Sequence, residues 1–497
     1  MSATEAPAAA PRFTQAAGVR RVLANALSLL LAYALPRLAI IGSIVVAARV
    51  LGADAFGAYS TAAAFAVVVS VLATLGMTPL LIRDIARAPE HALALLGAAH
   101  RVKTGTNAAM LVVLLVVARW VLDYPAPVVA AAALLGIAYA IGAYVENLSA
   151  YFQAVERMHV WTQASAVYGL VTGVAGLALV WATASLTWFC VAPVAGQLAA
   201  LGWLLKRLPA PLRRPATVGA GECRRLMRAL APFAIAFITL TIYYKVDVLL
   251  LARWRPAADV GIYAAAYKFV DIVQALAIVA VGAVYPRLSR AARAAGTGGW
   301  WVGAGVTELM LLAAVPVAGV LWLLRAPLLG WLYGDAYAAA APVLGLLAPA
   351  LPALAVNILA GYVLGAMEKM TLVAGAYAGA LAVNVALNTL WVPVYGARGS
   401  AGAMLVSELV LGVVLLGLLH WRAAAAPRLR TAATVVGACA VCGAVGALIA
   451  PDVGAALIFL AAVALLYAGS GVIPASERAV WRQALRPPRP VRAAEPG

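Results

Sequence analysis

The feature that most constrains this chain is a series of apolar segments, each about 20 residues long, that recurs along its length. A segment of this length crosses the ~30 Å hydrocarbon core of a bilayer as an α-helix. Of the 497 residues, 65% are hydrophobic and only 11% are charged, whereas a soluble domain carries roughly 25% charged residues. We therefore predict an all-α integral membrane protein, because helices satisfy their own backbone polar groups in lipid.

About fourteen transmembrane helices are predicted from these segments. They begin near residues 24, 56, 104, 128, 160, 185, 232, 261, 301, 340, 371, 400, 432 and 455. No convincing small-residue cleavage site follows the first segment, so we expect it to be a retained helix and not a signal peptide.

The net charge of +18 is explained by topology and does not require a nucleic acid partner. If the N-terminus is cytoplasmic, most Lys and Arg residues fall on the inner side of the membrane and few fall in outer loops. The positive-inside rule then places both termini in the cytoplasm. We predict a multi-pass protein of the cytoplasmic (inner) membrane whose basic surface contacts anionic lipid head groups.

The cysteines give no sign of a metal or redox centre. Cys439 and Cys442 have C-x-x-C spacing, but they lie in an apolar predicted helix without a neighbouring His or acidic residue. We interpret them as small core residues and expect neither a metal site nor a cofactor.

Two stretches that lie 204 residues apart resemble each other. The first, "ARVLGADAFGAYSTAAAF", begins at Ala48, and the second, "ARWRPAADVGIYAAAYKF", begins at Ala252. In this register Gly57 aligns with Gly261. An even number of predicted helices separates the copies, so both halves share one orientation. We predict two parallel-related six-helix lobes around a central cavity, plus two extra C-terminal helices.

The predicted organisation has six parts. They are a disordered cytoplasmic tail at 1–21, an N-terminal lobe of helices 1–6 at 22–205, a basic cytoplasmic linker at 206–230, a C-terminal lobe of helices 7–12 at 231–421, helices 13–14 at 422–474, and a basic cytoplasmic tail at 475–497.

Three motifs resemble those of one family. "ARVLGADAFGAYS", "DVLLLARWRPAADVGIYAAAYKFVD" and "WVPVYGARGSAGAMLVSE" are similar to the helix 1–2, 7–8 and 11–12 regions of polysaccharide-export (Wzx-like) flippases, in the multidrug/oligosaccharidyl-lipid/polysaccharide (MOP) superfamily. The resemblance covers roughly residues 25 to 420. It implies a transporter, not an enzyme, that moves a polyprenyl-pyrophosphate-linked glycan from the inner to the outer leaflet by alternating access. Implied partners are membrane lipid and polysaccharide polymerase or export proteins, and we expect a monomer.

The predicted helices contain charged residues that lipid does not accept freely. A Lys or Asp at the centre of a membrane helix costs roughly 2.5–3.5 kcal/mol on insertion scales, so it normally faces a partner or a wet cavity. "TIYYKVDVLLLA" carries Lys245 and Asp247, which point about 200° apart on a helix and cannot pair with each other. Lys268 and Asp271, spaced i and i+3, share a face and can interact. A packing that pairs Asp247 with Lys268 would leave Lys245 facing the cavity.

These charges are open to two interpretations. Arg37, Lys245 and Lys268 can form a cationic site for a pyrophosphate or acidic sugar, with Asp247 and Asp271 as counter-ions or ion-coupling groups. Alternatively, the lysines form neutralised pairs that orient helices.

Arg83 and Arg287 occupy equivalent positions in the two copies. They can gather an anionic head group at the cytoplasmic entry, or they can serve only topology and lipid anchoring.

Other functions are weighed against the flippase. A lipid II or drug/cation exporter of the same superfamily would share the topology. A polyprenyl-linked-sugar glycosyltransferase would need acidic residues in a sizeable outer loop, and the predicted outer loops are short, with acidic residues that stand singly.

Overall fold

The structure, a computed structural model, describes residues 15–74, 76–213, 219–294, 300–423 and part of the stretch 454–463. Within these ranges all regular secondary structure is helical, which confirms the predicted all-α class. The α-helices are α1 (Gln15–Thr74), α2 (Met77–Arg87), α3 (Ala92–Val116), α4 (Ala126–Ala154), α5 (Met158–Thr183), α6 (Leu186–Phe189), α7 (Val191–Arg207), α8 (Ala220–Tyr243), α9 (Val246–Trp254), α10 (Ala257–Ala294), α11 (Trp300–Leu323), α12 (Arg325–Tyr333), α13 (Ala340–Leu347), α14 (Ala350–Ala366), α15 (Met370–Tyr395) and α16 (Ala397–Ala423).

Eight of the described helices are long and apolar enough to cross a membrane, or up to ten if each of two bent helix pairs counts as one span. The longest, α1, contains the first two predicted spans. It consists of two helical segments that meet at Gly52, where φ is 80° and the helical path is broken. This left-handed conformation is readily adopted only by glycine. Residues 15–21, predicted to be part of a disordered tail, are helical in α1. The predicted helices over 422–474 lie almost wholly outside the described residues, and residues 1–14 and 475–497 lie outside them entirely.

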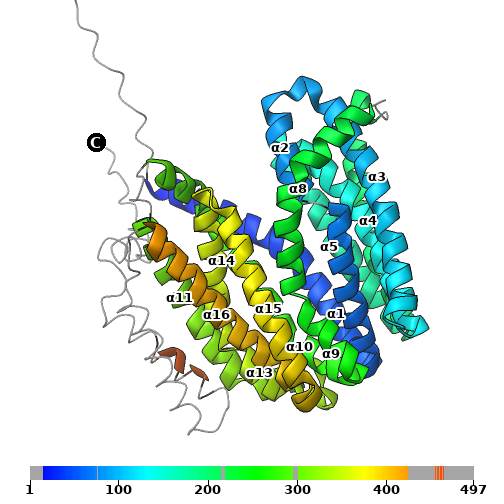
Figure 1. The fold of residues 1–497 in the computed structure, drawn as a ribbon, viewed down its shortest axis with the longest axis vertical. Coiled ribbons are helices and arrows are strands. Elements are labelled where there is room, and N and C mark those ends of the chain that lie inside the picture. Colours follow the sequence, from blue (N-terminus) through cyan, green and yellow to red (C-terminus); the bar gives the residue numbers. More distant parts are fainter. Residues whose placement is uncertain are drawn as a thin grey trace, which may run out of the picture.

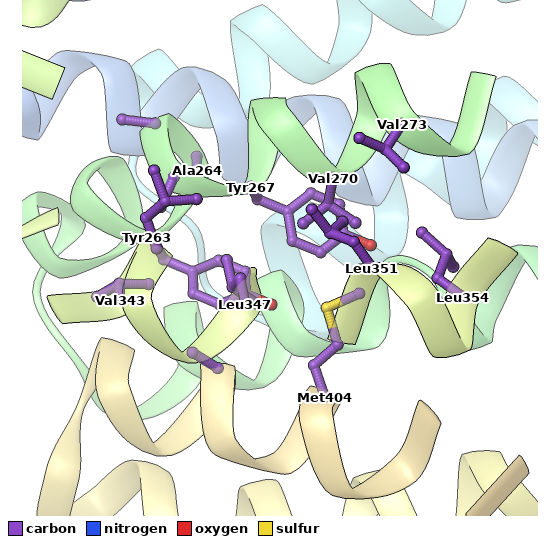
Figure 2. Packing of buried hydrophobic residues seen from close by; sticks show 14 of the residues in the cluster. Tyr263, Ala264, Tyr267, Val270, Val273, Val343, Leu347, Leu351, Leu354 and Met404 are labelled. Carbon is purple, nitrogen blue, oxygen red and sulfur yellow. The ribbon is translucent and has the colours of Figure 1, made fainter. Parts of the chain in front are cut away.

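The helices form two bundles that lean apart from a common base (Figure 1). In the first bundle, the N-lobe, α1 packs on α3, α4 and α5, and α7 packs on α4 and α5. In the second, the C-lobe, α10 packs on α13 and α14, and α16 packs on α13, α14 and α15. Tyr263 and Tyr267 of α10 fill the space between Leu347, Leu351 and Met404 on the neighbouring helices (Figure 2).

The helix α8 contacts both lobes. Near its start, Leu226 and Leu230 are buried among N-lobe side chains of α2 and α3. At its end, Tyr243 packs with Tyr377 of α15 in the C-lobe. The predicted seventh helix therefore begins inside the segment assigned to the basic linker and crosses from one bundle to the other.

The two lobes touch most closely where α1 meets α10, at the end of the molecule that carries α9 (Figure 1). A Cβ atom on Gly57 would collide with the carbonyl oxygen of Ala257, and a Cβ atom on Gly261 would collide with that of Ala53. The contact is reciprocal, as expected for two halves related by a two-fold axis. Small residues four apart are the usual means of close backbone approach between membrane helices.

Side chains extend this contact between the lobes. The hydroxyl of Tyr337 donates a hydrogen bond of 2.8 Å to the carbonyl oxygen of Ala48. The ring of Phe56 lies 6.4 Å from that of Tyr333 and 6.2 Å from that of Tyr337, measured between centroids. The lobes are thus closed against each other at the α9 end.

We expect Gly57→Val to separate the lobes at the α9 end, because backbone atoms cannot move away from the added side chain without moving α10. The measurement is the distance between spin labels on Val50 and Trp331, two exposed positions on either side of the contact, in a chain whose native cysteines are replaced by Ala. Gly42→Val on the same helix is the control, since a Cβ there meets open space. An unchanged distance distribution in Gly57→Val would contradict the prediction.

Candidate functional site

The break between α8 and α9 places Lys245 at the centre of a charged cluster. Lys245 precedes α9, which has nine residues and is therefore about 14 Å long, roughly half the thickness of a bilayer core. Its Nζ lies 3.3 Å from Oδ1 of Asp271. The other carboxylate oxygen of Asp271 lies 2.8 Å from Nζ of Lys268. One anion thus bridges two cations from two helix segments.

The cluster keeps an excess positive charge and is not sealed. The side chains of Lys245, Lys268 and Asp271 are 27%, 25% and 26% exposed. Nζ of Lys245 also lies 5.2 Å from the ring centroid of Tyr267, which belongs to the core cluster against which Tyr59 of the N-lobe packs. The cluster therefore faces the opposite lobe and is placed to attract a further anion.

Part of the predicted geometry is confirmed here. Lys268 and Asp271 share a helix face and pair, and Lys245 lies at the depth of Lys268, because both reach one carboxylate. The predicted pairing of Asp247 with Lys268 is wrong: Lys268 is satisfied within its own helix by Asp271, and Asp247 lies in a different environment.

Asp247 is buried among neutral hydrogen-bond donors. Its Oδ1 accepts a 2.8 Å hydrogen bond from Nδ2 of Asn388, and its Oδ2 accepts a 3.2 Å bond from the hydroxyl of Tyr263. Asn384, one turn before Asn388 on α15, donates to Ser407 at 3.0 Å. Among the described residues no Lys or Arg forms an ion pair with Asp247, so this carboxylate has polar support but no counter-ion.

A second buried carboxylate, Glu408 of α16, is held in a similar way. Its Oε1 accepts a 3.0 Å bond from the hydroxyl of Tyr243, and its Oε2 accepts a 2.7 Å bond from Nδ2 of Asn357. Glu408, Asn357, Asn384 and Asn388 are not among the site residues predicted from the sequence. Asn384 and Asn388, spaced i and i+4 within an apolar segment, are the pattern that could have indicated a polar helix face.

Arg37 is not brought into the cluster of Lys245 and Lys268. It is exposed on α1, and within the described residues no ion pair involves it. Arg37 shares a helix face with Ile40 and Ile44, at spacings of i+3 and i+7. Both isoleucines line a cavity inside the N-lobe, so Arg37 continues that face one turn farther along.

This N-lobe cavity has a volume of about 110 Å³. It lies between α1, α4, α5, α6 and α7. Its polar lining consists of five hydroxyl groups and one amide, those of Ser43, Tyr59, Tyr139, Tyr168, Thr172 and Gln197. The rest of the lining is apolar and consists of Ile40, Ile44, Ala63, Leu135, Ala138, Phe189, Ala192 and Pro193.

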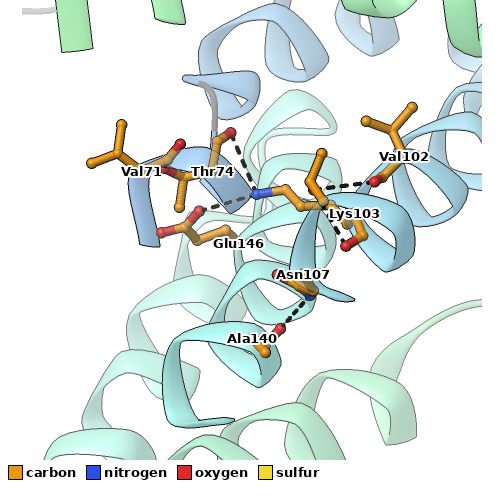
Figure 3. Close-up of polar contacts among 8 residues, drawn as sticks. Val71, Thr74, Val102, Lys103, Asn107, Ala140 and Glu146 are labelled. Atoms are coloured by element: carbon orange, nitrogen blue, oxygen red, sulfur yellow. Dashed lines mark hydrogen bonds and ion pairs between the residues drawn. The ribbon is translucent and has the colours of Figure 1, made fainter. Parts of the chain in front are cut away.

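Lys103, one of the basic residues on the cytoplasmic side, is buried. Its side chain is 0% exposed and its Nζ lies 3.8 Å from Oε2 of Glu146 (Figure 3). Nζ also donates to the carbonyl oxygen of Thr74 at 3.5 Å. Nearby, Asn107 donates to the carbonyl oxygen of Ala140 at 3.0 Å. These bonds tie α1, α3 and α4 together, so Lys103 is structural.

The proposed entry residues are only partly described. Arg83 is exposed on α2 and pairs with Asp84, with 2.7 Å between Nε and Oδ1. Arg287 lies in the helix α10, but its side chain lies outside the described part, as do Cys439 and Cys442. The roles assigned to Arg83 and Arg287 stay predictions.

Two helical lobes closed against each other at one end, built from eight to ten described helices or bent helix pairs long and apolar enough to cross a membrane, define a polytopic membrane protein. The chain belongs to the polysaccharide biosynthesis protein family, whose model matches residues 22–292. This family match agrees with the resemblance to polysaccharide-export proteins that the sequence motifs indicate, and the fold is one that solved transporters of the MOP superfamily share.

Several solved structures share the fold. The lipid II flippase MurJ, in an inward closed conformation, is 12% identical, with a TM-score of 0.71 over 93% of this chain and 100% of that one. An inward-facing multidrug resistance MATE transporter is 13% identical, with a TM-score of 0.61 over 80% and 98% of the two chains. A MOP superfamily transporter from Pyrococcus furiosus is 13% identical, with a TM-score of 0.56 over 82% and 94%. No curated protein matches the chain.

We expect Asp271→Asn to be far more destabilising than Lys268→Gln. The first change leaves two lysines without their shared anion, and breaking a buried pair costs about 3 kcal/mol or more. The second leaves Lys245 and Asp271 as a neutral pair. The free energy of unfolding in detergent measures the difference. Asp123→Asn, at a carboxylate that is 87% exposed, is the control, and equal losses in Asp271→Asn and Lys268→Gln would contradict the prediction.

Proposed function

We propose that this protein is a flippase that carries a polyprenyl-(pyro)phosphate-linked oligosaccharide from the inner to the outer leaflet of the cytoplasmic membrane, for surface or extracellular polysaccharide. In this proposal both termini are cytoplasmic, and the α9 end, which carries few basic residues, faces outward. The protein works as a monomer that delivers glycan to polymerase or export proteins.

The observation that carries the proposal is the bridged cluster of Lys245, Asp271 and Lys268. Two cations on one anion leave one positive charge uncompensated, on side chains that are about one quarter exposed. A fixed charge there is costly unless it serves a ligand or a partner. A phosphate or pyrophosphate group would complete it with charge-assisted hydrogen bonds.

The closed contact at Gly57 and Gly261 supports alternating access. With the lobes joined at the α9 end, the cluster is approached from the opposite side, where the bundles diverge (Figure 1). Arg37, exposed on α1 and without an ion pair among the described residues, is proposed as a second cation along that approach. Arg83 and Arg287 are proposed to gather the head group before it enters.

The first test is flipping of a short-chain polyprenyl-diphosphate sugar in proteoliposomes. We expect the wild type to translocate it. Lys245→Ala and Arg37→Ala should each lose at least nine-tenths of the flipping rate, because a tenfold loss corresponds to about 1.4 kcal/mol of interaction with the head group. Lys369→Ala, which removes an exposed lysine that takes no part in the ion pairs of the cluster, should retain the rate. If the wild type moves no diphosphate lipid but exports a cationic drug, the flippase proposal fails. Equal rates in all four proteins would show that the charges are structural.

Asp247 is proposed as the coupling group. It is 2% exposed and lacks a cationic partner among the described residues, so a proton or a small cation would neutralise it. Its amide and hydroxyl neighbours supply further ligands for such an ion. Asp271, by contrast, already has two lysines and is proposed as their counter-ion.

Asp247→Asn should therefore weaken the dependence of flipping on an ion gradient. Asn keeps the shape of the side chain but loses the charge that an ion would neutralise. An imposed proton or sodium gradient across the proteoliposome membrane should accelerate flipping by the wild type and by Asp123→Asn. Flipping by Asp247→Asn should keep the rate that it has without a gradient. Acceleration of Asp247→Asn to the same extent as the wild type would exclude this role.

A further inference from the structure

Glu408 of α16 is a buried acid that the proposed transport mechanism leaves without a role. It is 0% exposed, and its carboxyl group accepts one hydrogen bond from Tyr243 and another from Asn357. Among the described residues no Lys, Arg or His forms an ion pair with it. Burial without a counter-ion favours the neutral, protonated carboxyl, whereas the two donors favour the carboxylate. Because these effects oppose each other, the group is suited to bind and release a proton.

A buried acceptor beside Glu408 lacks a donor. Asn357 is 0% exposed, and its Nδ2 donates to Oε2 of Glu408 at 2.7 Å and to the carbonyl oxygen of Glu408 at 2.9 Å. Oδ1 of the same amide is buried and accepts no hydrogen bond from any described residue. Buried polar atoms in proteins are nearly always hydrogen-bonded. A proton on Glu408 adds a donor to this site without the help of another residue.

The site fits a proton and not a metal cation. A hydrogen atom of Tyr243 or Asn357 already points at each carboxyl oxygen of Glu408, and these hydrogens would repel a cation. Hard cations also take about six oxygen ligands. Within the described part of the chain, no group of three or more His, Cys, Asp or Glu residues could hold a metal ion.

The other titratable groups around Glu408 come from α8, α9, α10 and α15. They are four phenols and one acid: Tyr243, Tyr244, Tyr267, Tyr377 and Asp247. The two lysines of the charged cluster pair with Asp271 instead. The helix α13 has no titratable side chain, and Tyr362 of α14 packs on Tyr285. Phenols ordinarily titrate at about pH 10, so a response near neutral pH comes from Glu408 or from Asp247.

The hydrogen bond between Tyr243 and Glu408 lies where α8 joins the C-lobe. Tyr243 is the last residue of α8, the helix that crosses from one lobe to the other, and Lys245 follows at the break. A hydrogen bond to an ionised carboxylate is roughly twice as strong as a neutral one. Ionised Glu408 therefore holds the end of α8 more firmly than protonated Glu408 does.

We propose that Glu408 is a proton-binding site that controls the attachment of α8 to the C-lobe. Above neutral pH the carboxylate accepts hydrogen bonds from Tyr243 and Asn357 and fixes the end of α8. On acidification Glu408 takes up one proton from water, its negative charge is lost, and the end of α8 is released. Local opening of the helix end gives the carboxyl group access to water. The inference does not depend on the transported substrate, and the site is separate from the coupling role proposed for Asp247.

The first measurement locates the proton by infrared difference spectroscopy of the full chain in nanodiscs, between alkaline and mildly acidic pH. A carboxyl group that takes up a proton gains a C=O stretching band. Asp247 is the other candidate for this band, since Asn388, Asn384 and Ser407 connect it to α16. We expect the band of a buried carboxyl in the wild type and in Asp247→Asn, and its loss in Glu408→Gln. Glu90→Gln, at an exposed position, should keep it.

The second measurement follows the end of α8 by hydrogen exchange and mass spectrometry, corrected for the effect of pH on free peptides. In the wild type, acidification should accelerate exchange there at least about fivefold, as expected when a charged hydrogen bond becomes a neutral one. Glu408→Gln should exchange fast at every pH, because the amide has no charge to lose. Tyr243→Phe keeps the ring and should also lose the response to pH, while its infrared band remains. Tyr395→Phe, the same change at a residue that is 63% exposed, should behave as the wild type does.

Each result decides the proposal. A wild type without the infrared band, or a band that survives in Glu408→Gln, would show that Glu408 binds no proton. A band that is lost in Asp247→Asn but kept in Glu408→Gln would place the proton on Asp247 and overturn the assignment. If Tyr243→Phe keeps the full response of α8 to pH, the proton does not act through this hydrogen bond and the control of α8 is refuted.

Discussion

The backbone contact between Gly57 and Gly261 fixes the positions of the functional groups on both sides. Because two glycines and two alanines meet without intervening side chains, α1 and α10 come together at the α9 end and then diverge. Lys268 and Asp271 lie two to three turns farther along α10, so they enter the space between the lobes at mid-depth. Any residue larger than glycine at the contact would push α1 and α10 apart and shift this cluster relative to the N-lobe. The close packing that joins the lobes therefore also positions the site.

The sequence could predict what depends on spacing along one helix. Apolar blocks of membrane-spanning length gave an all-helical class that the structure confirms, and the spacing of Lys268 and Asp271 gave a pair that forms at 2.8 Å. The register of 204 residues aligned Gly57 with Gly261, and these residues meet in space. Each of these results needs only helical periodicity or a count of residues.

The sequence could not predict which neighbouring helix a buried side chain faces. The sequence allows a packing that pairs Asp247 with Lys268, but Asn388, distant in sequence, provides a hydrogen bond to Asp247. Glu408 is held by Asn357 and Tyr243 from two other helices. Lys103 belongs to the basic residues of the cytoplasmic side, yet its side chain is 0% exposed and pairs with Glu146 of α4. In each case periodicity defines a face of one helix, and the partner depends on tertiary packing.

The duplication also explains why the two lobes differ chemically. The register that aligns Gly57 with Gly261 aligns Tyr59 with Tyr263, and Ser43 with Asp247. In the C-lobe, Asp247 accepts the hydrogen bond of Tyr263 and the space is filled. In the N-lobe, Ser43 is too short to replace the carboxylate and instead donates to the carbonyl oxygen of Ile40. Both Ser43 and Tyr59 then line an uncharged cavity. One acidic residue, present in one copy and absent from the other, thus separates a buried carboxylate in the C-lobe from an uncharged cavity in the N-lobe.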